Sequence, residues 1–259
     1  MQLEYFLIPF LAIMFFMHCL FILAIAIKNN SIVDIGWGLG FIIASGSVYC
    51  MTPTFPILTL LFITILVWGL RLSLYIFMRN HGKGEDFRYK QWREEWGNKV
   101  LIRSYFQVFL LQGIIMYLIH LPILLFGSEL LKGLIPLNMG FFQWTGLLIW
   151  LIGFAFESIA DYQLFSFKRD INNKGAILTT GLWKYTRHPN YFGESLVWWG
   201  IYLIVCPYGI AAFSIVSPLL MTYLLRKVSG VTLLEKKYTN NSTYQDYIRK
   251  TPVFIPFWK

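Results

Sequence analysis

Charged residues are scarce in this sequence of 259 residues. Only 14% of its residues are Asp, Glu, Lys or Arg, whereas soluble domains average about 25%. Hydrophobic residues make up 57% and aromatic residues 19%. The low charge excludes an ordinary soluble domain, and the aromatic content is typical of proteins with many rings at headgroup level. The composition therefore predicts a membrane protein.

Cysteine and histidine patterns of known metal sites are also missing. Cys19, Cys50 and Cys206 lie in apolar segments without CxxC spacing, which excludes a disulfide framework. The four histidines form no HxxxH or HxxE pair, so no metal site is expected. His18 and His120 are interpreted as satisfied or interfacial histidines in apolar segments.

Long apolar windows set the expected fold. A membrane span needs roughly 20 mostly apolar residues, and helices satisfy their own backbone hydrogen bonds in hydrocarbon. The sequence thus predicts an all-α, multi-pass transmembrane bundle of about seven helices. No linker, composition shift or repeat divides it, so residues 1–259 are expected to form one integral membrane domain, with polar cytoplasmic segments at 79–103 and 226–259. The predicted spans are about 3–27, 32–51, 56–78, 102–126, 141–160, 190–206 and 209–225.

Lysine and arginine are distributed unevenly between the predicted loops. If the N-terminus lies outside, 20 of the 22 basic residues fall on the inner side. This asymmetry follows the positive-inside rule and predicts a cytoplasmic C-terminus. It also accounts for the formal charge of +9 without a nucleic-acid partner. Membrane lipids are the expected partners.

Five ionisable residues fall inside the predicted spans. A charge at bilayer depth costs roughly 2.5–3.5 kcal/mol, so it normally faces a cavity or a partner. In the structural interpretation, the one arginine pairs with a carboxylate and locks the bundle. Five such residues toward the cytoplasmic half favour a functional pocket. They are Asp34, Arg71, Glu157, Asp161 and Glu194.

Helical spacing places these residues on three faces. Side chains four or seven residues apart share one face of a helix. Three polar faces directed inward from the cytoplasmic side predict a pocket with a basic mouth. The faces are Glu157–Asp161–Lys168, Asn190–Glu194–Trp198 and Arg71–Tyr75–Arg79.

The stretch "GLWKYTRHPNYFGESLVWWG" (181–200) combines a basic turn with the start of a span. Pro189 suits the first turn of a helix, and a helix start attracts phosphate groups. Asn190 can donate and accept hydrogen bonds, while Glu194 accepts them. These residues predict a site for a phosphorylated, amide-bearing cofactor. The charges nearby come from Lys168, Lys184 and Arg187.

This stretch resembles the signature of the steroid 5α-reductase superfamily, in particular its bacterial branch. The likeness extends to "DIGWGLGF", "RNHGKGEDFRY", "ADYQLFSFK" and the segment from "SGVTLLEKKY" to "YQDYIRKTPVFIP". The resemblance implies a seven-helix membrane protein, here of a bacterial cytoplasmic membrane. It also implies an oxidoreductase that uses NADPH to reduce a conjugated carbon–carbon double bond in a lipid or a terpenoid- or steroid-like enone.

The resemblance implies which residues bind the cofactor, but the residues that hold the substrate in the family are different in this sequence. In the mammalian steroid reductases, a Gln-Glu pair on the second span and a tyrosine on the third span hold the substrate ketone; the corresponding positions here are Val33-Asp34 and Trp68. The histidine and tyrosine that follow the arginine of their seventh span correspond to Gly230 and Leu234. The expected catalytic residue is Asp34, as a protonated acid that hydrogen-bonds the substrate carbonyl, with Tyr75 as a second donor. The expected cofactor residues are Asp161, Lys168, Arg187, His188, Asn190, Glu194, Trp198 and Arg226.

Two alternatives stay open. Isoprenylcysteine carboxyl methyltransferases and related phospholipid methyltransferases also carry an RHPxYxG stretch, which would imply S-adenosylmethionine as cofactor. Glu235 stands alone where their pattern favours paired glutamates. The third possibility is a non-catalytic lipid-binding protein.

Two further segments have structural interpretations. "GWGLGF" (36–41) lies in a span without a preceding strand, so its glycines indicate helix packing rather than a nucleotide loop. "GKGEDFRYKQWREEWG" (82–97) mixes both charge signs and is predicted to be a solvated, amphipathic loop. By family likeness, Glu85, Asp86 and Arg88 are alternatively expected to close over the cofactor.

Overall fold

The computed structural model describes residues 3–53, 55–133, 138–228, 230–236 and 238–258. Within these ranges all regular elements are helical and no strand is present. The chain divides into two compact units, 1–139 with 208–211 and 140–207 with 212–259. Each unit is described by itself. That residues 1–259 form one membrane domain, with cytoplasmic polar segments at 79–103 and 226–259, stays a prediction.

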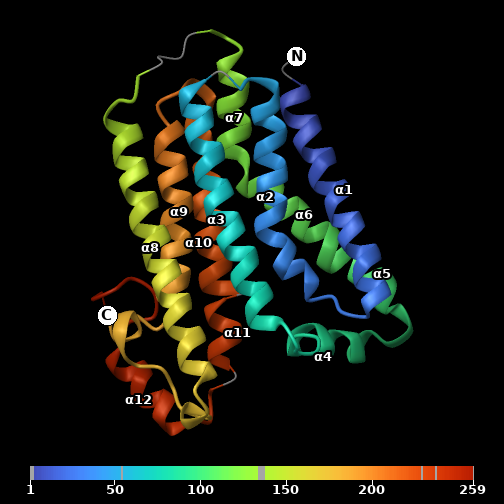
Figure 1. The fold of residues 1–259 in the computed structure, drawn as a ribbon, viewed down its shortest axis with the longest axis vertical. Coiled ribbons are helices and arrows are strands. Elements are labelled where there is room, and N and C mark those ends of the chain that lie inside the picture. Colours follow the sequence, from blue (N-terminus) through green and yellow to red (C-terminus); the bar gives the residue numbers. More distant parts are fainter. Residues whose placement is uncertain (1–2, 54, 134–137, 229, 237, 259) are drawn as a thin grey trace. The chain divides into compact units, whose positions relative to one another are not determined.

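The first unit consists of long helices followed by shorter helical pieces (Figure 1). Its α-helices are α1 (Glu4–Ile27), α2 (Ile32–Met51), α3 (Pro56–Asn80), α4 (Phe87–Trp96), α5 (Val100–Arg103), α6 (Leu111–Ile119) and α7 (Leu121–Leu130). A 3₁₀ turn, η1 (Gly97–Lys99), and a π-helical segment, η2 (Ser104–Leu110), connect α4 to α6.

The second unit is built around α8 (Phe141–Arg169) and α9 (Pro189–Val205), which lie side by side (Figure 1). The remaining elements are η3 (Ile171–Asn173), η4 (Gly181–Lys184), η5 (Gly209–Ile215), α10 (Val216–Tyr223), the π-helical η6 (Leu224–Val228), α11 (Val231–Lys236) and α12 (Ser242–Lys250). Residues 209–211 of η5 belong to the first unit.

Six helical runs in the described ranges are long and apolar enough to cross a membrane. They are Glu4–Ile27, Ile32–Met51, Pro56–Asn80, Phe87–Ile119, Phe141–Arg169 and Gly209–Lys236. The remaining predicted span, 190–206, is α9, which has 17 residues. The predicted all-α, multi-pass membrane fold is confirmed. The outside position of the N-terminus and the cytoplasmic position of the C-terminus stay predictions.

The predicted span at 102–126 is not a single helix. Its helical run ends at Ile119, and α7 begins at Leu121 with Pro122 in its first turn. Proline has no backbone N–H and its ring clashes with the carbonyl four residues earlier, so a helix ends before it. Upstream, the same run extends back to Phe87, where a solvated loop was predicted; α4 occupies that segment.

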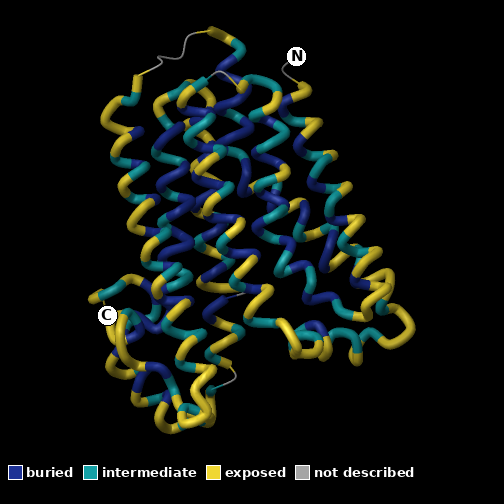
Figure 2. Tube along the Cα trace, viewed as in Figure 1, coloured by how far each residue is buried: buried dark blue, intermediate teal, exposed yellow. Residues whose placement is uncertain are grey.

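Exposed apolar side chains follow one side of α1. Leu7, Leu11, Phe15 and Ile22 are 46%, 54%, 70% and 55% exposed, and Figure 2 shows exposed turns along the helix. In water such a face would be an interaction surface. On a helix of this length and hydropathy, lipid chains are the expected cover, which fits an integral membrane protein.

The glycines of "GWGLGF" face three different helices of the first unit. A Cβ atom on Gly36 would lie 2.3 Å from a Leu20 methyl carbon of α1. One on Gly38 would lie 2.3 Å from the carbonyl oxygen of Gly69 on α3, and one on Gly40 would lie 2.4 Å from the sulfur of Met116 on α6. The predicted helix-packing role of this motif is confirmed.

Glycines also set the contact between α8 and α9. A Cβ atom on Gly146 would lie 2.7 Å from the carbonyl oxygen of Gly200, and one on Gly153 would lie 2.6 Å from that of Gly193. The reverse contacts, from Gly200 and Gly193, are 2.6 Å each. The pairs are seven residues apart on both helices and run in opposite directions. The helices are therefore antiparallel, with their backbones in direct contact.

The side of α8 that meets these glycines is buried from Gln143 to Asp161, and Figure 2 shows buried turns alternating with exposed ones on this helix. Buried positions recur every three or four residues, the period of a helix face. The face continues from glycine and tryptophan into two carboxylates. Its residues are Gln143, Gly146, Trp150, Gly153, Glu157, Ala160 and Asp161.

Replacing Gly193 by alanine is expected to separate α8 from α9. The new methyl group would lie 2.5 Å from the backbone nitrogen of Glu157, which no side-chain rotation relieves. Overpacking of this kind costs about 1–3 kcal/mol, so the apparent Tm in detergent, followed by circular dichroism, should fall by several degrees. Gly46→Ala is the control, because its methyl group would meet only a Phe62 ring atom at 3.5 Å. Equal losses in the two variants would contradict the prediction.

Candidate functional site

Asp34 lies in the first turn of α2, and both of its carboxylate oxygens accept hydrogen bonds. Arg88 Nη2 donates to one oxygen over 2.7 Å, and Tyr89 Oη donates to the other over 2.6 Å. Arg88 and Tyr89 thus engage both oxygens of Asp34, and its predicted role, a protonated acid that donates to a substrate carbonyl, stays a prediction.

The segment around "GED" is fastened to the turn between α1 and α2. Glu85 Oε1 accepts the backbone N–H of Asn30 over 2.6 Å, and the carboxylate also binds Arg93 over 2.9 Å. Asp86 caps α4 by accepting from the backbone N–H of Arg88 over 3.0 Å. Burial alone would raise the pKa of Asp86, but the hydrogen bonds and charge of Arg88 outweigh it and lower that pKa. These residues therefore hold α4, and a closing movement over a cofactor stays a prediction.

Tyr75 lies on α3 one turn before Arg79. The guanidinium carbon of Arg79 is 5.7 Å from the centre of the Tyr75 ring, a cation–π contact. Both predicted catalytic residues, Asp34 and Tyr75, belong to the first unit, whereas every predicted cofactor residue belongs to the second.

Three carboxylates are buried in the second unit. Glu157, Asp161 and Glu194 are only 2%, 3% and 8% exposed. Glu157 lies against α9, because its backbone nitrogen is the nearest neighbour of the Cβ position at Gly193. Buried ionisable groups at membrane depth mark pathways or binding sites more often than packing. The structure thus brings the predicted faces of α8 and α9 together.

Asn190 joins the two faces. Its side-chain amide donates to Asp161 Oδ1 over 3.1 Å. A carboxylate accepts only, so the amide NH₂ must point toward Asp161 and its carbonyl oxygen away from it. That oxygen, Asn190 Oδ1, is buried and accepts no hydrogen bond from any described residue. A buried acceptor without a donor is costly, so this oxygen indicates a place for a ligand's N–H or O–H group.

Arg187 is the centre of a second group, directly before α9. Its Nε and Nη2 donate to the carboxylate of Glu235 over 2.7 and 3.2 Å. Its Nη1 donates to the carbonyl oxygens of Ile248 and Thr251 over 3.3 and 2.6 Å. Arginine has five N–H donors, and four of them are used here. Arg187, predicted to bind the cofactor, chiefly holds the distal segments in place.

His188 precedes Pro189 as the N-cap residue of α9, so the helix starts where the sequence predicts. Its ring nitrogen Nε2 is 3.1 Å from Glu235 Oε1, and its ring stacks on Tyr191 with centroids 5.5 Å apart. Burial lowers the pKa of His188; the hydrogen bond and charge of Glu235 oppose this shift without reversing it. The imidazole is therefore neutral near pH 7 and is occupied by contacts within the protein.

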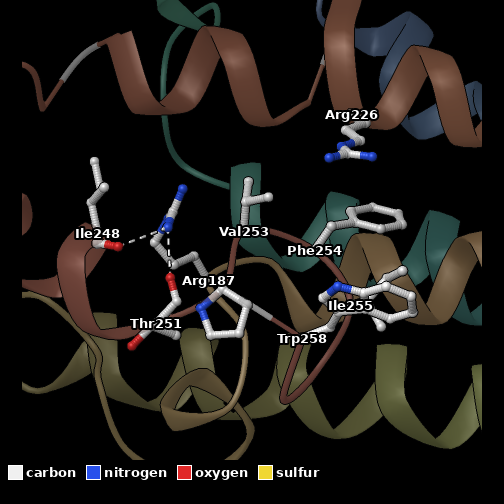
Figure 3. Close-up of a pocket in the computed structure, with 9 residues that line it drawn as sticks. Arg187, Arg226, Ile248, Thr251, Val253, Phe254, Ile255 and Trp258 are labelled. Carbon is white, nitrogen blue, oxygen red and sulfur yellow. Dashed lines mark hydrogen bonds between the residues drawn. The ribbon is translucent and has the colours of Figure 1, made fainter.

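A pocket of about 510 Å³ lies beside Arg187 (Figure 3). Arg187, Arg226, Ile248 and residues of the segment 251–258 line it. Its volume falls within the roughly 300–1,000 Å³ of small-molecule sites. The side chain of Arg226 makes no hydrogen bond or ion pair with any described residue and is exposed. The wall is mostly apolar, so an anionic group with a flat or apolar part fits the pocket best.

Hydrogen bonds fix the wall of this pocket against the basic turn. The backbone N–H of Arg187 donates to the carbonyl of Pro252 over 2.9 Å, and the hydroxyl of Thr186 donates to that of Phe254 over 2.9 Å. The N–H of Phe257 donates to the carbonyl of Tyr185 over 3.3 Å. Three successive residues, 185–187, thus hold the segment 252–257.

Two other predicted cofactor residues, Lys168 and Trp198, differ in how far they are buried. Lys168 is exposed at the end of α8. Trp198 is fully buried in the interior of the unit. Its predicted place beside a nicotinamide ring stays a prediction.

Three contributors to these sites were not predicted from the sequence. Tyr89 was not assigned to Asp34, because 55 residues separate them. Glu235 was seen only as an unpaired glutamate, and the segment 251–258 was seen only as family likeness. The signal available for Glu235 was its position in a charged segment that the resemblance covers.

Comparison with known proteins gives the family. Residues 20–251 match the family described as "Protein of unknown function (DUF1295)". The chain belongs to the DUF1295 family. The match covers α2 to α12 and so includes most of both units of this DUF1295 chain.

A protein of the fission yeast Schizosaccharomyces pombe, described only as uncharacterized, is 27% identical over 215 residues. The match covers 68% of this chain and 57% of the relative, so the chain spans about 57% of that relative's length. No solved structure matches. Because this relative is eukaryotic, it lends no support to the predicted bacterial membrane.

Replacing Glu235 by glutamine is expected to loosen the basic turn. The change leaves Arg187, whose side chain is 9% exposed, without its ionic partner. Removing one member of a buried pair costs about 3–5 kcal/mol, so the apparent Tm should fall clearly. Asp246→Asn is the control: its pair with Arg249 is 62% and 75% exposed, and such pairs contribute at most about 1 kcal/mol. A Glu235 variant as stable as the control would count against this pairing.

The lowered pKa of His188 predicts that stability depends on pH. The unfolded chain binds a proton near pH 6.5, whereas the folded chain binds it only at lower pH. Unfolding is therefore favoured as the pH falls below about 6.5. The apparent Tm should decrease between pH 7.5 and 5.5, and His188→Asn should flatten that slope. His81→Asn, which changes an exposed histidine, should keep it; identical slopes in all three proteins would refute the assignment.

Proposed function

We propose that this protein is a membrane-embedded reductase that uses NADPH to reduce a conjugated carbon–carbon double bond in a lipid-like enone. The observation that carries the proposal is the buried carbonyl oxygen of Asn190, oriented by Asp161 and without a donor among the described residues. A nicotinamide carboxamide or a ribose hydroxyl supplies such a donor. Glu157 and Glu194, which lie one helical turn from Asp161 and Asn190, are buried in the same unit.

The charge around the start of α9 supports a phosphorylated cofactor. Arg226, whose guanidinium group makes no ion pair with a described residue, lines the pocket beside Arg187. Guanidinium groups form bidentate hydrogen bonds with phosphate. NADPH carries several phosphate charges, whereas S-adenosylmethionine carries none. This difference favours NADPH.

The reaction balances as a hydride and a proton added across the double bond. When bound, NADPH supplies the hydride to the β-carbon, and the α-carbon takes a proton. In this proposal, the residues of the second unit bind and orient the cofactor. The predicted proton donor, Asp34, is bonded to Arg88 and Tyr89 in this structure, so the proposal concerns the cofactor site and the reaction class.

A specific contact supports one alternative. Glu235 binds Arg187 and His188, which links the two segments that resemble lipid and isoprenylcysteine methyltransferases. S-adenosylmethionine also carries a ribose diol that suits Asp161 and Asn190. A methyl transfer to a membrane lipid is therefore the second candidate.

Ligand-induced thermal stabilisation distinguishes the two. A ligand at 100 times its Kd stabilises the folded protein by about 2.7 kcal/mol. We expect NADPH to raise the apparent Tm of the protein in detergent, and S-adenosylmethionine to leave it unchanged. Stabilisation by S-adenosylmethionine alone would establish the methyltransferase instead, and stabilisation by neither would remove both enzymatic candidates.

Asn190→Ala should weaken NADPH by about tenfold or more, since a lost hydrogen bond to a buried group is worth about 1–3 kcal/mol. Asn172→Ala removes an exposed side chain and should leave NADPH affinity as it is. Consumption of NADPH with an enone-bearing isoprenoid, followed at 340 nm, then tests the chemistry. An Asn190 variant with unchanged affinity would contradict the assignment of this site.

A further inference from the structure

Trp258 presents an unused aromatic face to the pocket. It lines the cavity together with Ile255 (Figure 3), yet 74% of its surface is exposed. No aromatic or cationic partner contacts its ring among the described residues. By contrast the neighbouring Phe257 packs on Tyr185, with ring centroids 4.8 Å apart.

The backbone before Trp258 is strained in a way that sets its direction. Phe257 has a φ of 65°, in the left-handed region that residues other than glycine and asparagine rarely adopt. The Tyr185 carbonyl holds the Phe257 N–H, and the Trp258 N–H closes the turn on the carbonyl of Ile255 over 3.3 Å. Strain of this kind persists only where surrounding contacts over-determine it, and it concentrates at binding sites.

The same pocket contains a cation without a partner. The guanidinium of Arg226 makes no ion pair with a described residue, whereas that of Arg187 is taken by Glu235. A flat exposed ring and an uncommitted guanidinium in one cavity match a flat, anionic ligand. Bases stack on aromatic side chains, and arginine binds phosphate.

We propose that Trp258 is the stacking platform for the adenine base of the cofactor, with Arg226 binding the adjacent phosphate. This inference rests on the proposed function and adds the position of the adenosine half. It makes segment 251–258 a specificity-determining part of the site. The pocket of about 510 Å³ accommodates a nucleotide-sized group.

Two sources of a phosphate are possible in a membrane protein, a nucleotide and a lipid headgroup. A headgroup supplies the anion for Arg226 but no planar base for Trp258. A tryptophan at headgroup level would also be exposed without any ligand. Probes with and without adenine separate these cases.

The experiment compares adenosine 2′,5′-bisphosphate, ribose 5-phosphate and dihexanoyl phosphatidylglycerol by calorimetric titration of the full chain in detergent. Stacking of one base contributes about tenfold in affinity. We expect the adenosine bisphosphate to bind at least tenfold more tightly than the other two. Trp258→Ala should remove most of this advantage and leave ribose 5-phosphate unaffected, while Trp258→Phe should keep it.

The matched control is Trp144→Ala, which removes another exposed tryptophan, 59% exposed on α8. It should leave all three affinities unchanged. Because Trp258 is exposed, its alanine variant should fold with an unchanged apparent Tm, which the same samples report. Arg226→Gln should weaken every phosphate-bearing probe, with or without adenine.

The inference and the proposed function fail separately. Nucleotide binding that depends on Trp258, without reduction of any enone, keeps the inference and removes the reductase. NADPH binding that is equal in wild type and Trp258→Ala overturns the inference and leaves the reductase. Failure of wild type to bind the adenosine bisphosphate, or a preference for the phosphatidylglycerol, also overturns the inference.

Discussion

The backbone contact between α8 and α9 is the constraint on which the second unit depends. Gly146 and Gly153 meet Gly200 and Gly193 at distances that leave no room for a side chain. In a membrane, where lipid chains are as apolar as leucine, close packing of this kind is what holds helices together. The same contact decides the register, so it fixes which polar residues of the two helices face each other.

This register brings buried carboxylates close to the start of α9, where one of them orients a neighbouring side chain. Asp161 orients the amide of Asn190, and that amide keeps one acceptor for an outside donor. Arg187 lies just before this helix and donates four hydrogen bonds to residues that follow it in the sequence by 48 to 64 positions. The start of this helix is thus surrounded by groups that are already positioned before any ligand arrives.

The bounds of the long helices could be predicted from the sequence, whereas the pairing of charged residues could not. The bounds of α2, Ile32–Met51, equal the predicted window, because apolar length alone defines a span. The packing role of Gly38 was accessible for a similar reason: a small residue in a span has few other uses. The partner of Asp34 was not accessible, since Arg88 comes from another helix and the choice depends on how α4 docks. The sequence indicates that a buried charge is costly, but it does not identify the residue of opposite charge that pairs with it.

Segment 252–257 is joined to residues 185–187 by backbone and hydroxyl hydrogen bonds, and this has a consequence for biosynthesis. The pocket wall leaves the ribosome only after all six apolar runs have been made. Membrane insertion and completion of the pocket are therefore separate events in the life of the chain. A chain that stopped after residue 250 would contain the six apolar runs found in the described ranges but would lack this wall.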